Sequence, residues 1–489
     1  MLDSSAAGGM AIRGGLIRTA GYLVGAALTA GASVFLLRHL GVVDAGRYIT
    51  VMSLLAIVSG LADAGLGVVG NREYVNRASA QERRELLGGL LGMRLATATT
   101  GVAAAALFGV VAGYGSTLVI GTLVAGIGVI LASASSTLTV PLASSLRQGA
   151  VTVIEVSQRL TMVAGFAVLV ILSAELSRFF VVPLAAGLVA LLVTTLAVGR
   201  ASSVRPRFAR EQWAEIAREV APVAAAVVVQ VIYIRALVVL ISLVEPGIQT
   251  GLYATSTRIL ELVAAVPLLA VSASFPIMAR AGATDEERLA GALQRTGQAT
   301  LLLVVLLILG LAIAADPIVR LLGGDEYAPA APVLRIQAFA LLGAGLTPVW
   351  TLGLIAIRRQ RPLAVINAVA LVTVVGLGLA LIPALGARGA ALAAAIGEAA
   401  LAVLALVMLA RARPGLRPRL GYLPRTLAAG GLGALAVLIP GLPDVAQALL
   451  ATTICAGVAW ALGVVPGDIL RALLRRGAPA GPEAPQASM

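Results

Sequence analysis

The segment VAPVAAAVVVQVIYIRALVVLISLV, residues 220–244, carries one charged side chain, that of Arg235. As an α-helix it would extend about 37 Å, which exceeds the roughly 30 Å hydrocarbon core of a bilayer. A helix that is apolar on all its faces is stable only when lipid or protein surrounds it. The segment therefore predicts a transmembrane helix with an arginine well inside it.

Similar segments recur along the whole chain of 489 residues, of which 59% are hydrophobic and 12% are charged. A soluble domain carries about twice that charged fraction, so soluble and disordered classes are excluded. The single cysteine, Cys455, excludes a disulfide framework, and the single histidine, His39, excludes a His-rich metal site. We predict an all-α polytopic membrane protein with about fourteen transmembrane helices. The predicted spans are 14–37, 47–70, 86–112, 117–140, 150–173, 179–199, 219–244, 252–278, 297–315, 333–357, 363–383, 388–410, 426–441 and 446–465.

The distribution of basic residues between the connections predicts which side of the membrane each connection faces. All 36 are arginines, and when the connections are assigned alternately to two sides, about 26 fall on one side and about six on the other. Arginine-rich connections stay in the cytoplasm, so we predict that both termini are cytoplasmic. The net charge of +13 then needs no nucleic acid as a partner.

Two short motifs recur six spans apart. Gly46-Arg47-Tyr48 opens the second span and Gly251-Leu252-Tyr253 opens the eighth, while Arg147-Gln148 and Arg359-Gln360 precede the fifth and the eleventh. An even number of spans gives both copies the same orientation, as in transporters built from parallel repeats. We predict two six-helix lobes with pseudo-twofold symmetry, 1–212 and 213–424, an additional helix pair at 425–476 and a disordered cytoplasmic tail at 477–489.

Charged groups inside a span cost at least about 2.5–3.5 kcal/mol each at its centre, so they face a wet cavity or a partner. Arg258 and Glu261 are three residues apart and share one face of the eighth span. They fit either a self-contained ion pair or a Glu261 that positions Arg258 toward a cavity. We predict that the substrate-binding residues of a central cavity are Arg235, Arg258, Glu261, Asp63 and Asn367. Asp63 also fits a second interpretation, a carboxylate near the span end that pairs with an arginine.

Three further ionisable residues are candidates for coupling or pairing. Glu398 lies in the Ala-rich twelfth span, where it could titrate or pair. Glu155 and Arg159 lie nearer the cytoplasmic end of the fifth span, which favours snorkelling or packing. A coupling ion, Na⁺ or H⁺, stays open, and neither a metal site nor a cofactor is indicated.

The sign of the deepest charges points to the ligand. Arg235 and Arg258 are guanidinium groups, which bind a diphosphate through bidentate, charge-assisted hydrogen bonds and stay ionised when partly dehydrated. An exporter of organic cations would be expected to present carboxylates instead. The pattern favours an anionic head group, and no catalytic constellation indicates an enzyme.

Several motifs together resemble the Wzx-type flippases of polysaccharide precursors, a family of the MOP (MATE-like) transporter superfamily. The motifs are Arg38-His39-Leu40-Gly41, Gly46-Arg47-Tyr48, Asp63-Ala64-Gly65-Leu66, Gly251-Leu252-Tyr253-Ala254 with Arg258-Ile259, and Ile382-Pro383 through Gly389-Ala390-Ala391. The resemblance extends over nearly the whole chain. One departure is the seventh span, where the family often has Arg-x-Asp and this chain has Arg235-Ala236-Leu237.

The resemblance implies a V-shaped pair of lobes in the bacterial cell membrane and a cationic central cavity. It implies alternating access for an undecaprenyl-diphosphate-linked oligosaccharide, with membrane lipids, glycan polymerases and glycosyltransferases as further partners. Three alternatives stay open: a peptidoglycan lipid II flippase, a MATE-type multidrug antiporter, and, from another class, a membrane-embedded glycan polymerase or ligase. The last is disfavoured because the longest external connection, 316–332, is short.

Overall fold

A computed structural model describes residues 5–145, 147–199, 204–208, 210–359 and 361–464. Within these ranges the regular structure is entirely helical, as the apolar runs predict. The tail predicted at 477–489 lies outside the described residues.

The chain forms two compact units. The first comprises Met1–Val263, Ala315–Ala340 and Gln360–Leu404, and the second comprises Ala264–Ala314, Leu341–Arg359 and Ala405–Met489. The lobe boundaries at 212 and 424 stay a prediction.

Most of the helices belong to the first unit. They are α1 (Ser5–Asp63), α2 (Leu66–Asn76), α3 (Ala80–Val111), α4 (Ser116–Leu138), α5 (Val140–Ser144), α6 (Gln148–Ile171), α7 (Leu176–Phe179), α8 (Val181–Val198), α9 (Arg210–Val244), α12 (Ala315–Gly323), the 3-10 helix η2 (Asp325–Ala330), α13 (Ala331–Gln337) and α15 (Arg361–Leu385). The second unit holds α11 (Glu286–Ile313), α14 (Ala340–Ala356), η3 (Pro414–Leu416), α17 (Tyr422–Ala434), η4 (Leu435–Leu438) and α18 (Asp444–Ala461). The boundary between the units falls inside α10 (Ile248–Thr284) and α16 (Ala387–Ala412), and Ala340, the first residue of α14, belongs to the first unit.

The described residues contain 11 helices that are long and apolar enough to cross a membrane, or up to 12 if the bent pair of α13 and α14 forms one span. One of them, Ala27–Asn76, has 50 residues. At about 1.5 Å per residue it would extend about 75 Å, enough for two crossings. It contains the predicted span 47–70 and the last part of 14–37, whose earlier residues lie in the preceding part of α1. The thirteenth predicted span corresponds to the shorter apolar stretch Tyr422–Leu438. The all-α polytopic class is confirmed.

The two spans within α1 meet at Gly41. Its φ of 68° and ψ of 176° are accessible essentially only to glycine. Polar groups of the connection between α11 and α13 contact the backbone around this break. Tyr327 Oη donates a hydrogen bond to Leu37 O at 3.0 Å, and Val42 N donates one to Glu326 Oε1 at 3.4 Å. These bonds satisfy backbone groups that the interrupted helix leaves free.

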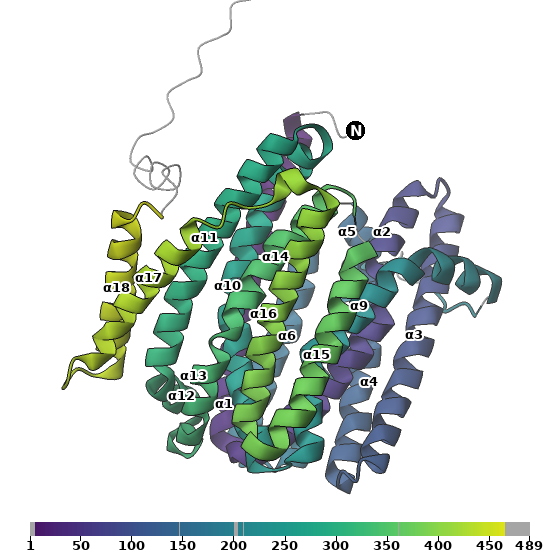
Figure 1. Cartoon of the computed structure of the whole chain (residues 1–489). Coiled ribbons are helices and arrows are strands. Elements are labelled where there is room, and N and C mark those ends of the chain that lie inside the picture. The colour runs from purple at the N-terminus through teal and green to yellow at the C-terminus, as the bar shows by residue number, and fades with distance from the viewer. Residues whose placement is uncertain (1–4, 146, 200–203, 209, 360, 465–489) are drawn as a thin grey trace, which may run out of the picture. The chain divides into compact units, whose positions relative to one another are not determined.

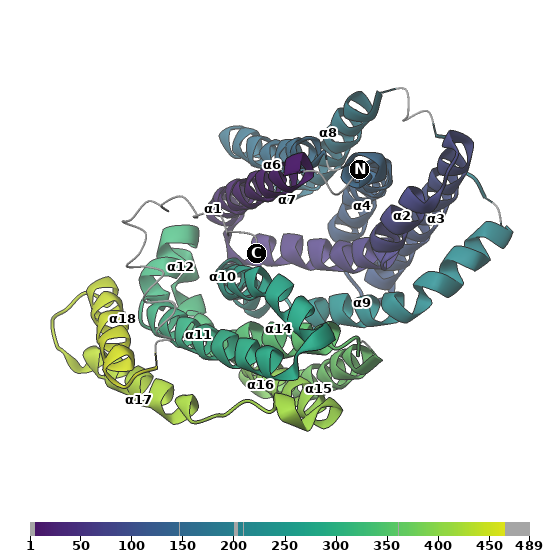
Figure 2. The same ribbon diagram turned by 90° about the horizontal axis from the view of Figure 1, so that it is seen from above.

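Helices α4, α6 and α8 pack side by side in the first unit, and α1 packs against α6 (Figure 2). The core between them is built from aromatic side chains. Tyr48 stacks on Phe180, with ring centroids 5.5 Å apart, and meets Phe166 edge-on at 5.8 Å. Phe179 is fully buried and lies 5.7 Å from Phe166.

In the second unit, α17 and α18 run side by side and both contact α11 (Figure 1). Their core contains Leu301, Tyr422 and the lone Cys455, all buried. A close approach of Gly433 to the Ala451 carbonyl and to Cys455 lets α17 and α18 pack tightly.

The two copies of the repeated motif contact each other in the first unit. A Cβ added at Gly46 of α1 would lie 2.7 Å from the Gly251 Cα of α10, and a Cβ added at Gly251 would collide with the Val42 carbonyl oxygen. Small residues allow transmembrane helices to approach this closely. The two glycines of the repeat are therefore required by the crossing of α1 and α10.

We expect Gly251→Ala to lower the apparent melting temperature of the purified protein in detergent by several degrees. The added methyl group overpacks the crossing, which typically costs about 1–3 kcal/mol. The matched control is Gly31→Ala on α1, because nothing lies within 4 Å of a Cβ at Gly31. Equal melting temperatures for the two variants, measured by fluorescence-detected gel filtration, would contradict the close crossing.

Candidate functional site

A cavity of about 520 Å³ opens within the first unit. It is lined by side chains of α1, α4, α6, α8, α9 and α10. Much of its wall is apolar, with Leu36, Met52 and Phe166 among the lining residues. Four charged side chains interrupt this wall: Arg159, Arg235, Arg258 and Glu261. We call it the central cavity.

Two of the guanidinium groups share one carboxylate. Arg235 Nη1 lies 2.6 Å from Glu261 Oε1, and Arg258 Nη1 lies 3.4 Å from Glu261 Oε2. Arg258 Nε also donates a hydrogen bond to Ser33 Oγ at 3.3 Å. The three charged side chains are 24%, 39% and 29% exposed, in the order Arg235, Arg258 and Glu261. They are thus partly desolvated but still reach the cavity.

The third arginine is held by neutral partners. Arg159 Nη1 donates to the Gly25 carbonyl at 3.1 Å and to Thr29 Oγ1 at 2.9 Å, both on α1. Among the ion pairs of the described residues, none involves Arg159. Three guanidinium groups and one carboxylate give the central cavity an excess of two positive charges.

Of the predicted cavity residues, Arg235, Arg258 and Glu261 come together, and two others do not. Asp63 is 55% exposed and pairs with Arg94. These contacts agree with its second interpretation, a carboxylate near the span end that pairs with an arginine. Asn367 Nδ2 donates to the Ala226 carbonyl of α9 at 3.2 Å and is absent from the cavity lining. Their placement in the cavity is corrected, since hydropathy alone does not report the direction in which a polar residue points.

The coupling or pairing candidates are dispersed. Tyr233 Oη donates a hydrogen bond to Glu398 Oε1 at 2.7 Å, outside the cavity lining. Glu155 is exposed on α6, and no partner is found for it among the described residues. Arg159 lines the central cavity instead of the cytoplasmic end of its span. Among the described residues no cluster of three or more His, Cys, Asp or Glu side chains could hold a metal ion.

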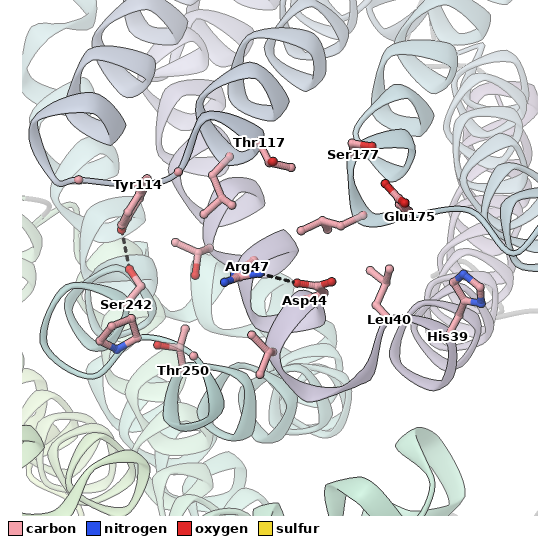
Figure 3. Close-up of a pocket in the computed structure, with 18 of the residues that line it drawn as sticks. His39, Leu40, Asp44, Arg47, Tyr114, Thr117, Glu175, Ser177, Ser242 and Thr250 are labelled. Atoms are coloured by element: carbon pink, nitrogen blue, oxygen red, sulfur yellow. Dashed lines mark hydrogen bonds and ion pairs between the residues drawn. The ribbon is translucent and has the colours of Figure 1, made fainter.

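Sequence reasoning missed a second hollow of the first unit, about 660 Å³ in volume, which we call the outer pocket. It lies where α1 breaks and where α3 joins α4 and α9 joins α10, connections that the predicted topology places outside the cell. Figure 3 shows its polar side chains facing a common space, with Asp44 and Arg47 paired at 2.9 Å. Tyr114 and Ser242 are hydrogen-bonded at 2.6 Å on one side, and Glu175 lies on the other. These residues adjoin turns, where hydropathy carries little information.

The apolar helices and the charged cavity inside them define a multi-pass membrane protein of the transporter class. The structure is similar to an inward-facing multidrug resistance MATE family transporter of the MOP superfamily, with a TM-score of 0.59, 16% identity, and coverage of 80% of this chain and 95% of that one. An outward-facing transporter of the same kind gives a TM-score of 0.56 at 15% identity, covering 83% and 96% of the two chains. The lipid II flippase MurJ in an inward closed conformation gives a TM-score of 0.77 at 12% identity, covering 94% of this chain and 100% of that chain. At such identities these similarities concern the fold.

The family follows from sequence. The family model of the lipid II flippase MurJ matches residues 162–453, more than half of the chain, and the chain belongs to this family. No curated protein matches in a sequence search. The protein is a lipid-linked precursor flippase and not an enzyme, as predicted. The superfamily was predicted correctly, whereas the findings indicate MurJ and not the Wzx-type family.

We expect Glu261→Gln to lower the apparent melting temperature in detergent, because the amide leaves Arg235 and Arg258 facing each other without the shared negative charge. Unpaired buried charges are more costly than unpaired neutral groups. Glu155→Gln is the matched control, since it makes the same chemical change on an exposed position of α6. If Glu261→Gln is as stable as Glu155→Gln, the carboxylate does not hold the two guanidinium groups.

Proposed function

We propose that the protein translocates lipid II, a polyprenyl-diphosphate-linked saccharide, across the bacterial cytoplasmic membrane by alternating access. The head group enters the central cavity from the cytoplasm while the lipid tail stays in the bilayer. A change of conformation then opens the cavity to the outside. No covalent bond is made or broken in this cycle.

The observation that carries the proposal is the excess of positive charge in the central cavity of a MurJ-family fold. A diphosphate diester carries about two negative charges, which matches the excess left when Glu261 neutralises one of three guanidinium groups. When such a ligand binds, its two negative charges and the two excess positive charges of the cavity neutralise each other. Little uncompensated charge is then left in the bilayer core.

The arginines have hydrogen-bonding capacity to spare. A guanidinium group has five N–H donors, and the bonds found for Arg159, Arg235 and Arg258 use only a few of them. The remaining donors lie in one cavity with the Glu261 carboxylate, which fixes the orientation of two of the groups. Such a preorganised fork suits phosphate oxygens.

The same features argue against the other transporters considered. A MATE-type exporter of organic cations shares the fold, but a cavity with excess positive charge repels such substrates. An undecaprenyl-diphosphate-linked polysaccharide precursor presents the same diphosphate as lipid II. The family match favours lipid II over that cargo.

We expect Arg235→Ala and Arg258→Ala each to reduce lipid II translocation at least about tenfold, because each removes charge-assisted hydrogen bonds to the diphosphate. Arg235→Lys should keep part of the activity, since the charge remains and the bidentate fork is lost. The assay expresses the protein in bacteria depleted of their own lipid II flippase and measures the lipid II that an externally added hydrolase can cleave.

The matched control is Arg388→Ala, an exposed arginine at the start of α16 that lines neither the central cavity nor the outer pocket. The Arg388→Ala variant should translocate lipid II at the wild-type rate. If the protein exports a surface polysaccharide precursor and no lipid II is cleaved, lipid II is not the substrate and the polysaccharide precursor is. Full activity in Arg235→Ala at normal protein levels would remove Arg235 from the mechanism.

A further inference from the structure

The outer pocket differs from the central cavity in the sign of its charge. Its charged side chains are Asp44, Arg47 and Glu175, which leave an excess of one negative charge when His39 is neutral. Asp44 and Arg47 pair with each other, whereas the Glu175 carboxylate has no hydrogen-bond or ion-pair partner within the described part of the chain. An anionic diphosphate is therefore disfavoured in the outer pocket.

Hydroxyl groups surround these charges. Thr50, Thr117, Ser177, Ser242 and Thr250 all line the outer pocket. Ser242 is bonded to Tyr114, and Thr50 and Thr250 donate to the carbonyls of Gly46 and Glu245. Thr117 and Ser177 are exposed, and their hydroxyl groups are the ones that can contact a ligand. A hydroxyl group can both donate and accept a hydrogen bond, and the Glu175 carboxylate can accept several. Together these groups suit an uncharged ligand that carries many hydroxyl groups.

A series of aromatic contacts, which we call the aromatic layer, connects the linings of the two hollows. Arg47 lines the outer pocket, and the next residue, Tyr48, lines the central cavity. Tyr48 stacks on Phe180 and meets Phe166 edge-on, and Phe166 is tilted against Phe179. His39 of the outer pocket stacks on Phe179, with ring centroids 5.6 Å apart. The two hollows are therefore neighbours within the first unit.

We propose that the outer pocket is a second substrate subsite, which binds the uncharged saccharide part of the lipid-linked head group on the outward side of the aromatic layer. The inference rests on the proposed function. The central cavity holds the anionic end by its arginines, and the outer pocket accepts the sugar end by hydroxyl and carboxylate groups. Its volume of about 660 Å³ is within the range of sites for small organic ligands.

Photocrosslinking tests the assignment with two probes. Benzoylphenylalanine is placed at Thr117 in the outer pocket, at Gln158 in the central cavity, and at Arg388, which lines neither. Each purified variant is reconstituted in vesicles with lipid II or with undecaprenyl diphosphate, which lacks the sugars. We expect lipid II to be captured at Thr117 and at Gln158, undecaprenyl diphosphate at Gln158 only, and neither at Arg388.

The outcomes separate the inference from the function on which it rests. Capture of lipid II at Gln158 but not at Thr117 overturns the outer subsite and leaves the proposed function standing. Equal capture of both probes at Thr117 overturns its selectivity for sugar. No capture at either position overturns the proposed function itself. Ser177, also exposed in the outer pocket, serves as a second position if the Thr117 variant does not fold.

A substitution probes the chemistry of the outer pocket. Glu175→Gln keeps the shape and removes the charge, so capture of lipid II at Thr117 should fall about tenfold while capture at Gln158 is unchanged. Arg178→Ala, an exposed neighbour outside the pocket lining, should change neither. Undiminished capture at Thr117 in Glu175→Gln would show that this carboxylate does not bind the sugar.

Discussion

The central cavity depends on one carboxylate that two guanidinium groups share inside a membrane-spanning bundle. Without Glu261, Arg235 and Arg258 would bring two like charges close together in a medium of low dielectric constant, where their repulsion is strong. With it, they are held in place on α9 and α10 and still leave a positive excess with Arg159. The pairing thus allows the cavity to exist in the bilayer without cancelling the charge that an anionic substrate needs.

The central cavity and the outer pocket, which both border α1, have net charges of opposite sign. They can therefore bind different parts of one head group. The central cavity has an arginine excess and an apolar wall, whereas the outer pocket has hydroxyl groups and a carboxylate excess. Residues on both sides of the break at Gly41 line both hollows. A ligand with an anionic end and a sugar end has a different preference for each hollow, and a ligand shifts a conformational equilibrium only by its difference in affinity between the states.

The contacts that sequence could anticipate are local. Arg258 and Glu261 lie three residues apart on a helix and therefore share a face, and the long apolar runs around Arg235 indicated a position facing a cavity. Asp63 and Asn367 were misplaced because a single polar residue in a span reports that it needs a partner, not which partner it has. Arg94 and the Ala226 carbonyl, which provide them, lie on other helices.

The sequence by itself determined the membrane class and the charge type of the deepest residues, since hydropathy and charge act over a single segment. The cytoplasmic orientation of the termini stays a prediction from the arginine counts. Only the tertiary structure decided that Arg159 joins the cavity, that the glycines of the repeat meet, and that the turns enclose an outer pocket. Those features depend on how helices distant in sequence rotate and cross when they pack. Packing depends on the shapes of both partners, and no single segment contains that information.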